Sequence, residues 1–386
     1  MNIQLDVFFA IATASISSFL TAIVILLTQP LHARFSMDSD LGGIQKFHFR
    51  PVPRIGGVAV LVGLLAMPIY LNLGREGTVS YQDANIMLFA IMAALPAFFA
   101  GLLEDLTKKV SVRDRLIATF LSALLGAWVL GASLHRVDVI GLDILLQFAP
   151  FSLVVTAIAV GGVANSINLI DGFNGIAGGV VIVILSAIAV LAHQVNDPVV
   201  FNLSLIGIGA ALGFLLLNFP TGRLFMGDGG AYLLGFWVAE MAVLLVVRNA
   251  SINAWQLLAI CAYPVIEVIF SMYRRRVIRK CAPGAPDRLH LHSLLYRRFI
   301  CLRLPACKSG RTWVRNASVA CLIVPCLSIA TTISVIYGNT IASAFLISAF
   351  QVLVYLAVYG RLVRGHWCFR PTVLLGFRSK TKAWQI

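Results

Sequence analysis

Two neighbouring carboxylates lie beside a group of cations at the end of an apolar run. Glu104 and Asp105 are followed within ten residues by four basic residues, which are Lys108, Lys109, Arg113 and Arg115. Adjacent carboxylates in such a setting can hold a divalent metal ion or position a proton. The alternative is a solvated loop whose charges form surface salt bridges, and the residues by themselves leave both interpretations open.

A second segment with possible chemistry runs from Asn165 to Gly179, and Asp171 is its single charged residue. It also contains Asn168, Asn174 and four glycines. Glycines let a ligand approach the backbone closely, and the amides that open a following helix favour an anion. The alternative is a tight turn between two helices in which Asp171 serves as a cap.

The third cluster is a single carboxylate, Asp228, in the sequence Phe-Met-Gly-Asp-Gly-Gly that begins at Phe225. Glycines on both sides suit a magnesium ligand that must also admit a diphosphate. A helix N-cap explains the same aspartate equally well.

A fourth cluster, Asp287-Arg288-Leu-His290-Leu-His292, lies in a long polar stretch. Two histidines two residues apart suit an extended segment that binds phosphate. A zinc site is the competing interpretation, but no third ligand stands at a familiar spacing.

The elements that must position these clusters are membrane helices. The chain has 386 residues, of which 59% are hydrophobic and 12% charged, and its mean hydropathy is +0.90. Apolar runs near the ~20 residues that a bilayer-spanning helix requires recur along it. We therefore predict an all-α polytopic membrane protein with about eleven spans, in one domain over residues 1–386. The expected spans are Val7–Thr28, Ile55–Leu73, Ala84–Leu103, Leu116–Leu134, Ile144–Val163, Ile176–Ala192, Val199–Phe219, Ala231–Val247, Trp255–Met272, Ala317–Tyr337 and Ile341–Tyr359.

The basic residues predict the orientation, because cytoplasmic loops retain Lys and Arg. Of the 30 such residues, 27 fall on one side of the expected spans and three, Arg75, Arg136 and Arg248, on the other. This bias places the N-terminus outside and the C-terminus in the cytoplasm. All four polar clusters then lie at the cytoplasmic face, as expected for an active site there, together with a large loop at 274–315 and a basic tail at 360–386.

The formal net charge of +14 raises the question of nucleic-acid binding. The basic residues flank apolar spans and no recognised nucleic-acid motif accompanies them, so anionic membrane lipid and phosphate are the expected partners. The seven cysteines are odd in number and none lies in an expected external loop, so we expect no disulfide framework.

Five short motifs carry a resemblance to a known family. They are Pro53-Arg54-Ile-Gly56-Gly57, the acidic pair, Asn168-Leu-Ile-Asp171-Gly, Phe225-Met-Gly-Asp228-Gly and Asp287-Arg288-Leu-His290-Leu-His292. In this order, over residues 46–298, the chain resembles the polyprenyl-phosphate N-acetylhexosamine-1-phosphate transferases. The resemblance implies an enzyme of the bacterial inner membrane that transfers a sugar 1-phosphate from a UDP-sugar to undecaprenyl phosphate. UMP is released, and magnesium is the implied cofactor, with manganese as an alternative.

The resemblance also implies roles for individual residues. Asp228 is the leading magnesium ligand, Asp105 a second ligand or a base, and Asp171 with Asn168 part of the nucleotide and diphosphate site. The other implied substrate-binding residues are Arg50, Arg54, Glu104, Asn174, Arg288, His290 and His292.

Three positions depart from the family pattern. Glu104 stands where an aspartate is usual, Asn174 replaces a second aspartate, and Ser293 replaces a further histidine. The short histidine motif favours an N-acetylhexosamine, used to initiate a cell-surface polysaccharide, over a muramoyl pentapeptide, which is the alternative donor. A homo-oligomer is compatible with the sequence.

A membrane transporter is the rival from another class. Such a protein would carry charged or interrupted segments near the bilayer midplane and repeated halves. The sequence shows no internal repeat, and the charged residues singled out inside spans are Glu240 and Glu267. Glu267 lies near the cytoplasmic end of its span, and a single Glu240 is expected to be a satisfied packing residue.

Overall fold

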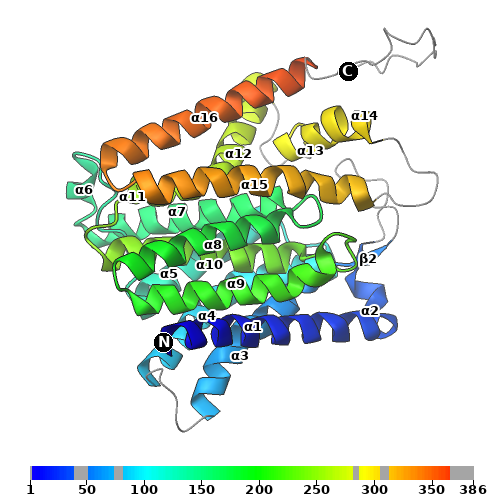
Figure 1. Cartoon of the computed structure of the whole chain (residues 1–386), viewed down its shortest axis with the longest axis horizontal. Coiled ribbons are helices and arrows are strands. Elements are labelled where there is room, and N and C mark those ends of the chain that lie inside the picture. The colour runs from blue at the N-terminus through cyan, green and yellow to red at the C-terminus, as the bar shows by residue number, and fades with distance from the viewer. Residues whose placement is uncertain (1, 39–50, 74–80, 281–286, 305–312, 366–386) are drawn as a thin grey trace.

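The computed structural model of the chain describes residues 2–38, 51–73, 81–280, 287–304 and 313–365. Ten helices of 18 or more residues form one bundle (Figure 1). They are α1 (Asn2–Leu27), α3 (Gly56–Leu73), α4 (Tyr81–Thr107), α5 (Val112–Leu130), α7 (Ala149–Ile170), α8 (Ile176–Gln194), α9 (Pro198–Asn218), α10 (Gly227–Arg248), α15 (Trp313–Tyr337) and α16 (Ile341–Arg364).

Shorter elements connect them. The helices are α2 (Gln29–Ser36), α6 (Leu142–Leu145), α11 (Ala254–Ile260), α12 (Ala262–Tyr273), α13 (Leu291–Leu295) and α14 (Cys301–Arg303). A π-helical turn, Arg274–Ile278, continues α12, and a second one, Tyr296–Ile300, links α13 to α14. The strands β1 (Met37–Asp38) and β2 (Val52–Pro53) pair antiparallel.

The helices confirm a polytopic membrane protein, but the count of eleven spans is not confirmed. Among the described residues, eight helices are long and apolar enough to cross a bilayer, and α11 with α12, bent by 81°, is a ninth candidate. The expected run at Ile55 gives only a short apolar helix, Gly56–Asn72. The run at Leu116 belongs to α5, whose first turn contains Arg113, Asp114 and Arg115. Neither helix supplies the ~20 apolar residues that a span of the hydrocarbon core requires.

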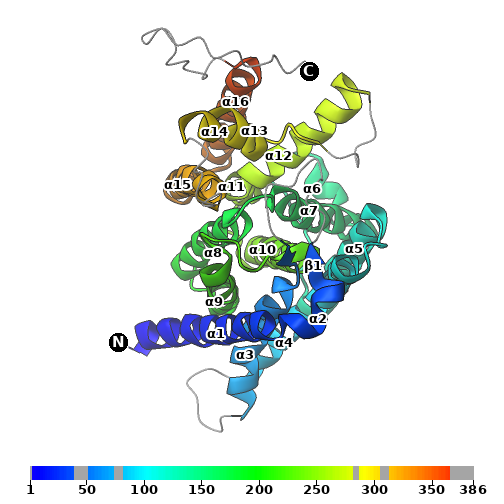
Figure 2. The same cartoon turned by 90° about the vertical axis from the view of Figure 1, so that its right-hand side faces the viewer.

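Helix α10 occupies the centre of the bundle. Figure 2 shows it surrounded by neighbouring helices, and it packs against α3, α4, α7, α8 and α9. Nearly all of its residues are buried, whereas most of α16 is exposed. The position of α10 matters because Asp228 lies in its first turn.

Close helix packing elsewhere depends on small residues, as in other membrane bundles. At the contact between α1 and α9, the Ser15 hydroxyl donates to the Gly209 carbonyl at 2.9 Å. The Ser18 hydroxyl donates to the Ala210 carbonyl at 2.8 Å. A Cβ at Gly213 would lie 2.2 Å from the Ser15 carbonyl oxygen, so α1 and α9 touch through their backbones.

The two ends of the bundle differ in charge. One end carries α6, and the opposite end carries α2, β2, α13 and α14 (Figure 1). In the described segments of the α6 end, the lysine and arginine residues are Arg136 and Arg248. The expected charge asymmetry is therefore present in space as well as along the chain.

Glu240 is buried in the middle of α10, with 0% of its surface exposed. We expected a satisfied packing residue, but within the described part of the chain neither carboxyl oxygen has a hydrogen-bond partner. The facing residue is Gly126 of α5, where an added Cβ would lie 2.2 Å from Glu240 Oε1. An unsatisfied buried polar group costs roughly 1–3 kcal/mol.

The variant Glu240→Met is therefore expected to unfold at a temperature a few degrees higher than the wild type, because it removes this cost and keeps an unbranched side chain. The matched control is Gln256→Met, since the buried Gln256 Nε2 donates to the Ser334 carbonyl at 3.1 Å. That control should lower the unfolding temperature. Equal destabilisation by both changes, measured in one detergent, would contradict the assignment of Glu240 as unsatisfied.

Candidate active site

Two segments far apart in the sequence form the base of the candidate site. Residues 53–57 run beside residues 225–226, and three backbone hydrogen bonds of 2.9–3.0 Å join them. The first segment is itself held by the β1–β2 pairing. This arrangement places Arg54 beside Asp228 at the end of the bundle opposite α6.

Asp105, in the last turn of α4, binds the beginning of α10. Its Oδ1 accepts the Asp228 amide at 3.0 Å and its Oδ2 accepts the Gly229 amide at 2.9 Å. The first amides of a helix have no partner within it and carry partial positive charge, so a carboxylate is well suited here. Asp105 is 1% exposed, and both of its oxygens are in use.

Asp228 lies between two guanidinium groups. Arg54 Nη2 is 3.3 Å from Asp228 Oδ1 and 3.2 Å from Asp105 Oδ1, so it bridges the two carboxylates. Arg115 pairs with Asp228 Oδ2 and lies over the ring of Tyr232. The Asp228 side chain remains 15% exposed. The sequence motifs did not assign a role to Arg115, although its place in the cationic cluster after Asp105 was the available signal.

Glycines allow the helices to meet at this point. A Cβ at Gly57 would lie 2.3 Å from the Gly230 nitrogen, and a Cβ at Gly101 would lie 2.6 Å from the Asp228 carbonyl carbon and oxygen. Real Cβ atoms do not approach backbone so closely. The contact between α4 and α10 therefore depends on the missing side chain of Gly101.

Asp171 follows the last residue of α7 and is partly exposed. Desolvation by the surrounding protein raises the pKa of its carboxyl to about 7, against the opposing charge of Arg54. Asn168, one turn earlier, is partly exposed and contacts the Tyr232 hydroxyl. That hydroxyl also donates to Asn165 Oδ1 at 3.2 Å, so α7 and α10 are joined next to Asp228.

Two of the expected substrate-binding residues make contacts with the protein backbone. Asn174 is 6% exposed, and its Nδ2 donates to the Pro220 carbonyl at 3.0 Å. Glu104 Oε2 accepts the Val110 amide at 2.8 Å. In this structure Asn174 joins two loops and Glu104 closes the turn after α4.

The segment that contains residues 287–292 contacts the site through His292. His290 and His292 are both 3% exposed, whereas Arg288 is exposed. A Cβ at Gly172 would lie 3.1 Å from His292 Nε2, so this ring lies against the residue that follows Asp171. Arg50, also expected in the site, lies outside the described residues.

The carboxylates fit a hard divalent cation. Asp228 and Asp171 offer oxygen ligands and are partly exposed. In the part of the chain that the structure describes, no three Asp, Glu, His or Cys side chains converge as a metal cage. Magnesium does not need such a cage, because it is commonly held by one or two carboxylates together with water and substrate phosphates.

Comparison with known proteins identifies a matching family and several similar proteins. The family model described as glycosyl transferase family 4 matches residues 87–246. The chain is 30% identical to the undecaprenyl-phosphate alpha-N-acetylglucosaminyl 1-phosphate transferase of Yersinia pestis over 267 residues, covering 67% of this chain and 69% of the relative. It is 27% identical over 289 residues to the probable undecaprenyl-phosphate N-acetylglucosaminyl 1-phosphate transferase of Bacillus subtilis (strain 168), covering 74% of this chain and 77% of the relative. A Thermotoga maritima undecaprenyl-phosphate alpha-N-acetylglucosaminyl 1-phosphate transferase is 27% identical over 285 residues, with 74% and 80% covered.

Proposed function

We propose a reaction for this chain, which belongs to glycosyl transferase family 4. It transfers an N-acetylhexosamine 1-phosphate from a UDP-sugar to undecaprenyl phosphate and releases UMP. The observation that carries this proposal is the cluster of Arg54, Asp105, Arg115 and Asp228 at one end of a membrane bundle. A lipid phosphate is accessible only at such an interface.

The reaction exchanges one phosphoric anhydride bond for another. An oxygen of the lipid phosphate attacks the β-phosphorus of the UDP-sugar, and the bond from that phosphorus to the bridging oxygen breaks. UMP leaves with that oxygen, and the product is a lipid diphosphate that carries the sugar. A lipid phosphate is already largely ionised near neutral pH, so the chemistry does not require a general base.

The side chains supply charge and position. Arg54 and Arg115 offset the negative charge that accumulates when two phosphates approach each other. Asp228 and Asp171 are the residues that would hold Mg²⁺, which when bound neutralises diphosphate charge as a Lewis acid. Asp105, with both oxygens on backbone amides, fits a positioning role for Asp228 better than a ligand or base.

The named relatives and the charge asymmetry support a more specific substrate and setting. The named relatives are N-acetylglucosaminyl transferases, which favours this sugar as the donor over a muramoyl pentapeptide. We place the site on the cytoplasmic side of a bacterial inner membrane, where UDP-sugars are available, and assign the product to the start of a surface polysaccharide.

The decisive assay uses purified protein, undecaprenyl phosphate and a panel of UDP-sugars, with UMP release followed against magnesium and manganese concentration. We expect UMP only when the lipid, an N-acetylhexosamine donor and a divalent cation are all present. Folded protein that releases no UMP from any donor would overturn the proposed function.

Topology can be tested separately. The charge asymmetry predicts that a reporter fused after Lys109 reads as cytoplasmic and that one fused after Arg248 reads as external. Fusions after Lys308 and Arg75 repeat the two measurements at independent positions. An external signal after Lys109 would place the acidic pair on the wrong face of the membrane.

A further inference from the structure

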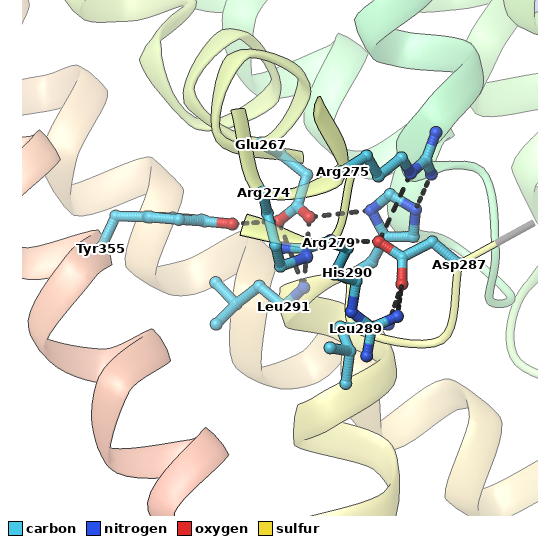
Figure 3. Close-up of polar contacts among 9 residues, drawn as sticks. All are labelled: Glu267, Arg274, Arg275, Arg279, Asp287, Leu289, His290, Leu291 and Tyr355. Carbon is cyan, nitrogen blue, oxygen red and sulfur yellow. Dashed lines mark hydrogen bonds and ion pairs between the residues drawn. The ribbon is translucent and has the colours of Figure 1, made fainter. Parts of the chain in front are cut away.

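Glu267 of α12 is a buried carboxylate that has no role in the reaction proposed above. It has 0% of its surface exposed and is the centre of a polar network (Figure 3). Oε1 is 3.0 Å from His290 Nδ1, Oε2 accepts the Tyr355 hydroxyl at 2.9 Å, and the Leu291 amide donates to both oxygens at 3.2 and 3.3 Å. Three donors from the loop and α16 therefore converge on one side chain of α12.

The network fixes the hydrogen on the His290 ring. Arg275 Nη2 is 3.1 Å from His290 Nε2, and a guanidinium can only donate. Nε2 must therefore accept, so Nδ1 carries the hydrogen and donates it to Glu267. Both ring nitrogens are thus engaged within the protein. His290, which the motif suggested as a phosphate ligand, is placed as a support in this structure.

The ring that His290 supports is His292. The two imidazoles are stacked, with centroids 5.3 Å apart and planes 5° apart. The His292 ring also contacts the edge of Phe173 at a centroid distance of 5.7 Å. Among the described residues His292 Nδ1 has no hydrogen-bond partner, and burial lowers the pKa of this imidazole to about 3. Ring packing therefore determines the orientation of His292.

The orientation of His292 matters because the ring lies against the loop that follows α7. Nε2 lies 3.1 Å from the position of a Cβ at Gly172, the residue after Asp171. The His292 ring beside this loop is therefore linked to α12 through the stacked His290 ring and its contact with Glu267.

We propose that Glu267 is a positioning residue for donor binding: it fixes His290, which holds His292 against the Asp171 loop, and Tyr355 anchors Glu267 to α16. The proposal rests on the proposed transferase function for its substrate, a UDP-sugar. It makes α16, which lies beyond the matched family region at 87–246, a functional part of the site.

The test compares Glu267→Leu with Glu267→Gln in the UMP-release assay. Glutamine keeps an oxygen for the His290 Nδ1 hydrogen and an amide hydrogen for Tyr355, so its KM for the UDP-sugar should stay within about threefold of the wild type. Leucine keeps the volume but none of the bonds, and should raise this KM about tenfold or more with a smaller change in kcat. Tyr355→Phe should fall between them.

Two controls separate positioning from general damage. Glu240→Met replaces another buried glutamate of a membrane helix and should leave the KM for the donor unchanged. Unfolding temperatures of all variants, measured in the same detergent, report on stability. A loss confined to kcat, or equal losses for Glu267→Gln and Glu267→Leu, would overturn the proposal.

A spectroscopic measurement tests the arrangement without activity. In protein with ¹⁵N-labelled histidine, His290 should show the neutral form with hydrogen on Nδ1, and Glu267→Leu should abolish that signature while Glu267→Gln keeps it. Absence of UMP release by wild-type protein would overturn the transferase function alone. An unchanged histidine spectrum in Glu267→Leu would overturn the positioning role alone.

Discussion

Replacing Asp228 with asparagine is expected to lower turnover by about 100-fold or more, within the range for loss of a positioned charged group. The side chain lies between Arg54 and Arg115 and is still partly exposed, so it can take part in binding a hard cation and a diphosphate. An amide cannot supply the anionic oxygen that magnesium prefers. The backbone contacts with Asp105 involve the Asp228 amide and stay intact.

The loss should therefore appear in kcat and in the magnesium dependence, not in the amount of folded protein. Asp143→Asn is the control at the opposite end of the bundle, where Asp143 Oδ1 accepts the Val137 amide at 2.7 Å. Near-normal turnover of Asp228→Asn at low magnesium concentration would show that the Asp228 carboxylate is not needed to bind the cation.

Gly101→Ala is expected to lower activity by roughly 100-fold, although residue 101 has no side chain in the site. The new methyl group would need to occupy space 2.6 Å from the Asp228 carbonyl group. The atoms at this contact are backbone atoms of a packed helix and cannot move aside as a flexible side chain could, so the helices must separate. A displacement of about 1 Å at reacting groups is enough for a loss of this size.

Gly162→Ala is the matched control, because a Cβ at Gly162 of α7 meets nothing within 4 Å. Turnover and unfolding temperature should be measured for both variants in the same lipid. We expect Gly162→Ala to behave as wild type in turnover. An active Gly101→Ala protein would mean that the contact between α4 and α10 is looser than the structure shows, and that the position of Asp228 does not depend on it.

The acidic pair shows how far a motif can define a site. The sequence placed Glu104 and Asp105 together at the end of an apolar run, and the family resemblance favoured Asp105 as a ligand or base. In the structure Asp105 is buried on the amides that begin α10, while Glu104 closes a turn. Adjacent residues on a helix point about 100° apart, so two neighbouring carboxylates face different surroundings.

The sequence by itself determined the class of protein and the end of the bundle at which the four polar clusters lie. Hydropathy is a local property, and a run of ~20 apolar residues predicts a helix whatever its neighbours are. The four clusters could be assigned to one face because the basic residues record the side of each loop. What hydropathy could not give was the number of spans, since α5 begins with charged residues and α11 and α12 are separated by a sharp bend.

Only the tertiary structure decided which helix ends and loops contact one another. The bond from the Asp228 amide to Asp105 joins residues 123 apart in sequence, and the contact of Arg54 with Asp228 joins residues 174 apart. No local pattern records such a pairing, because it depends on which helices pack around α10 and how closely glycine lets them approach. The same holds for Glu267, which looked like a single acid near the end of a span until the loop and α16 were placed around it.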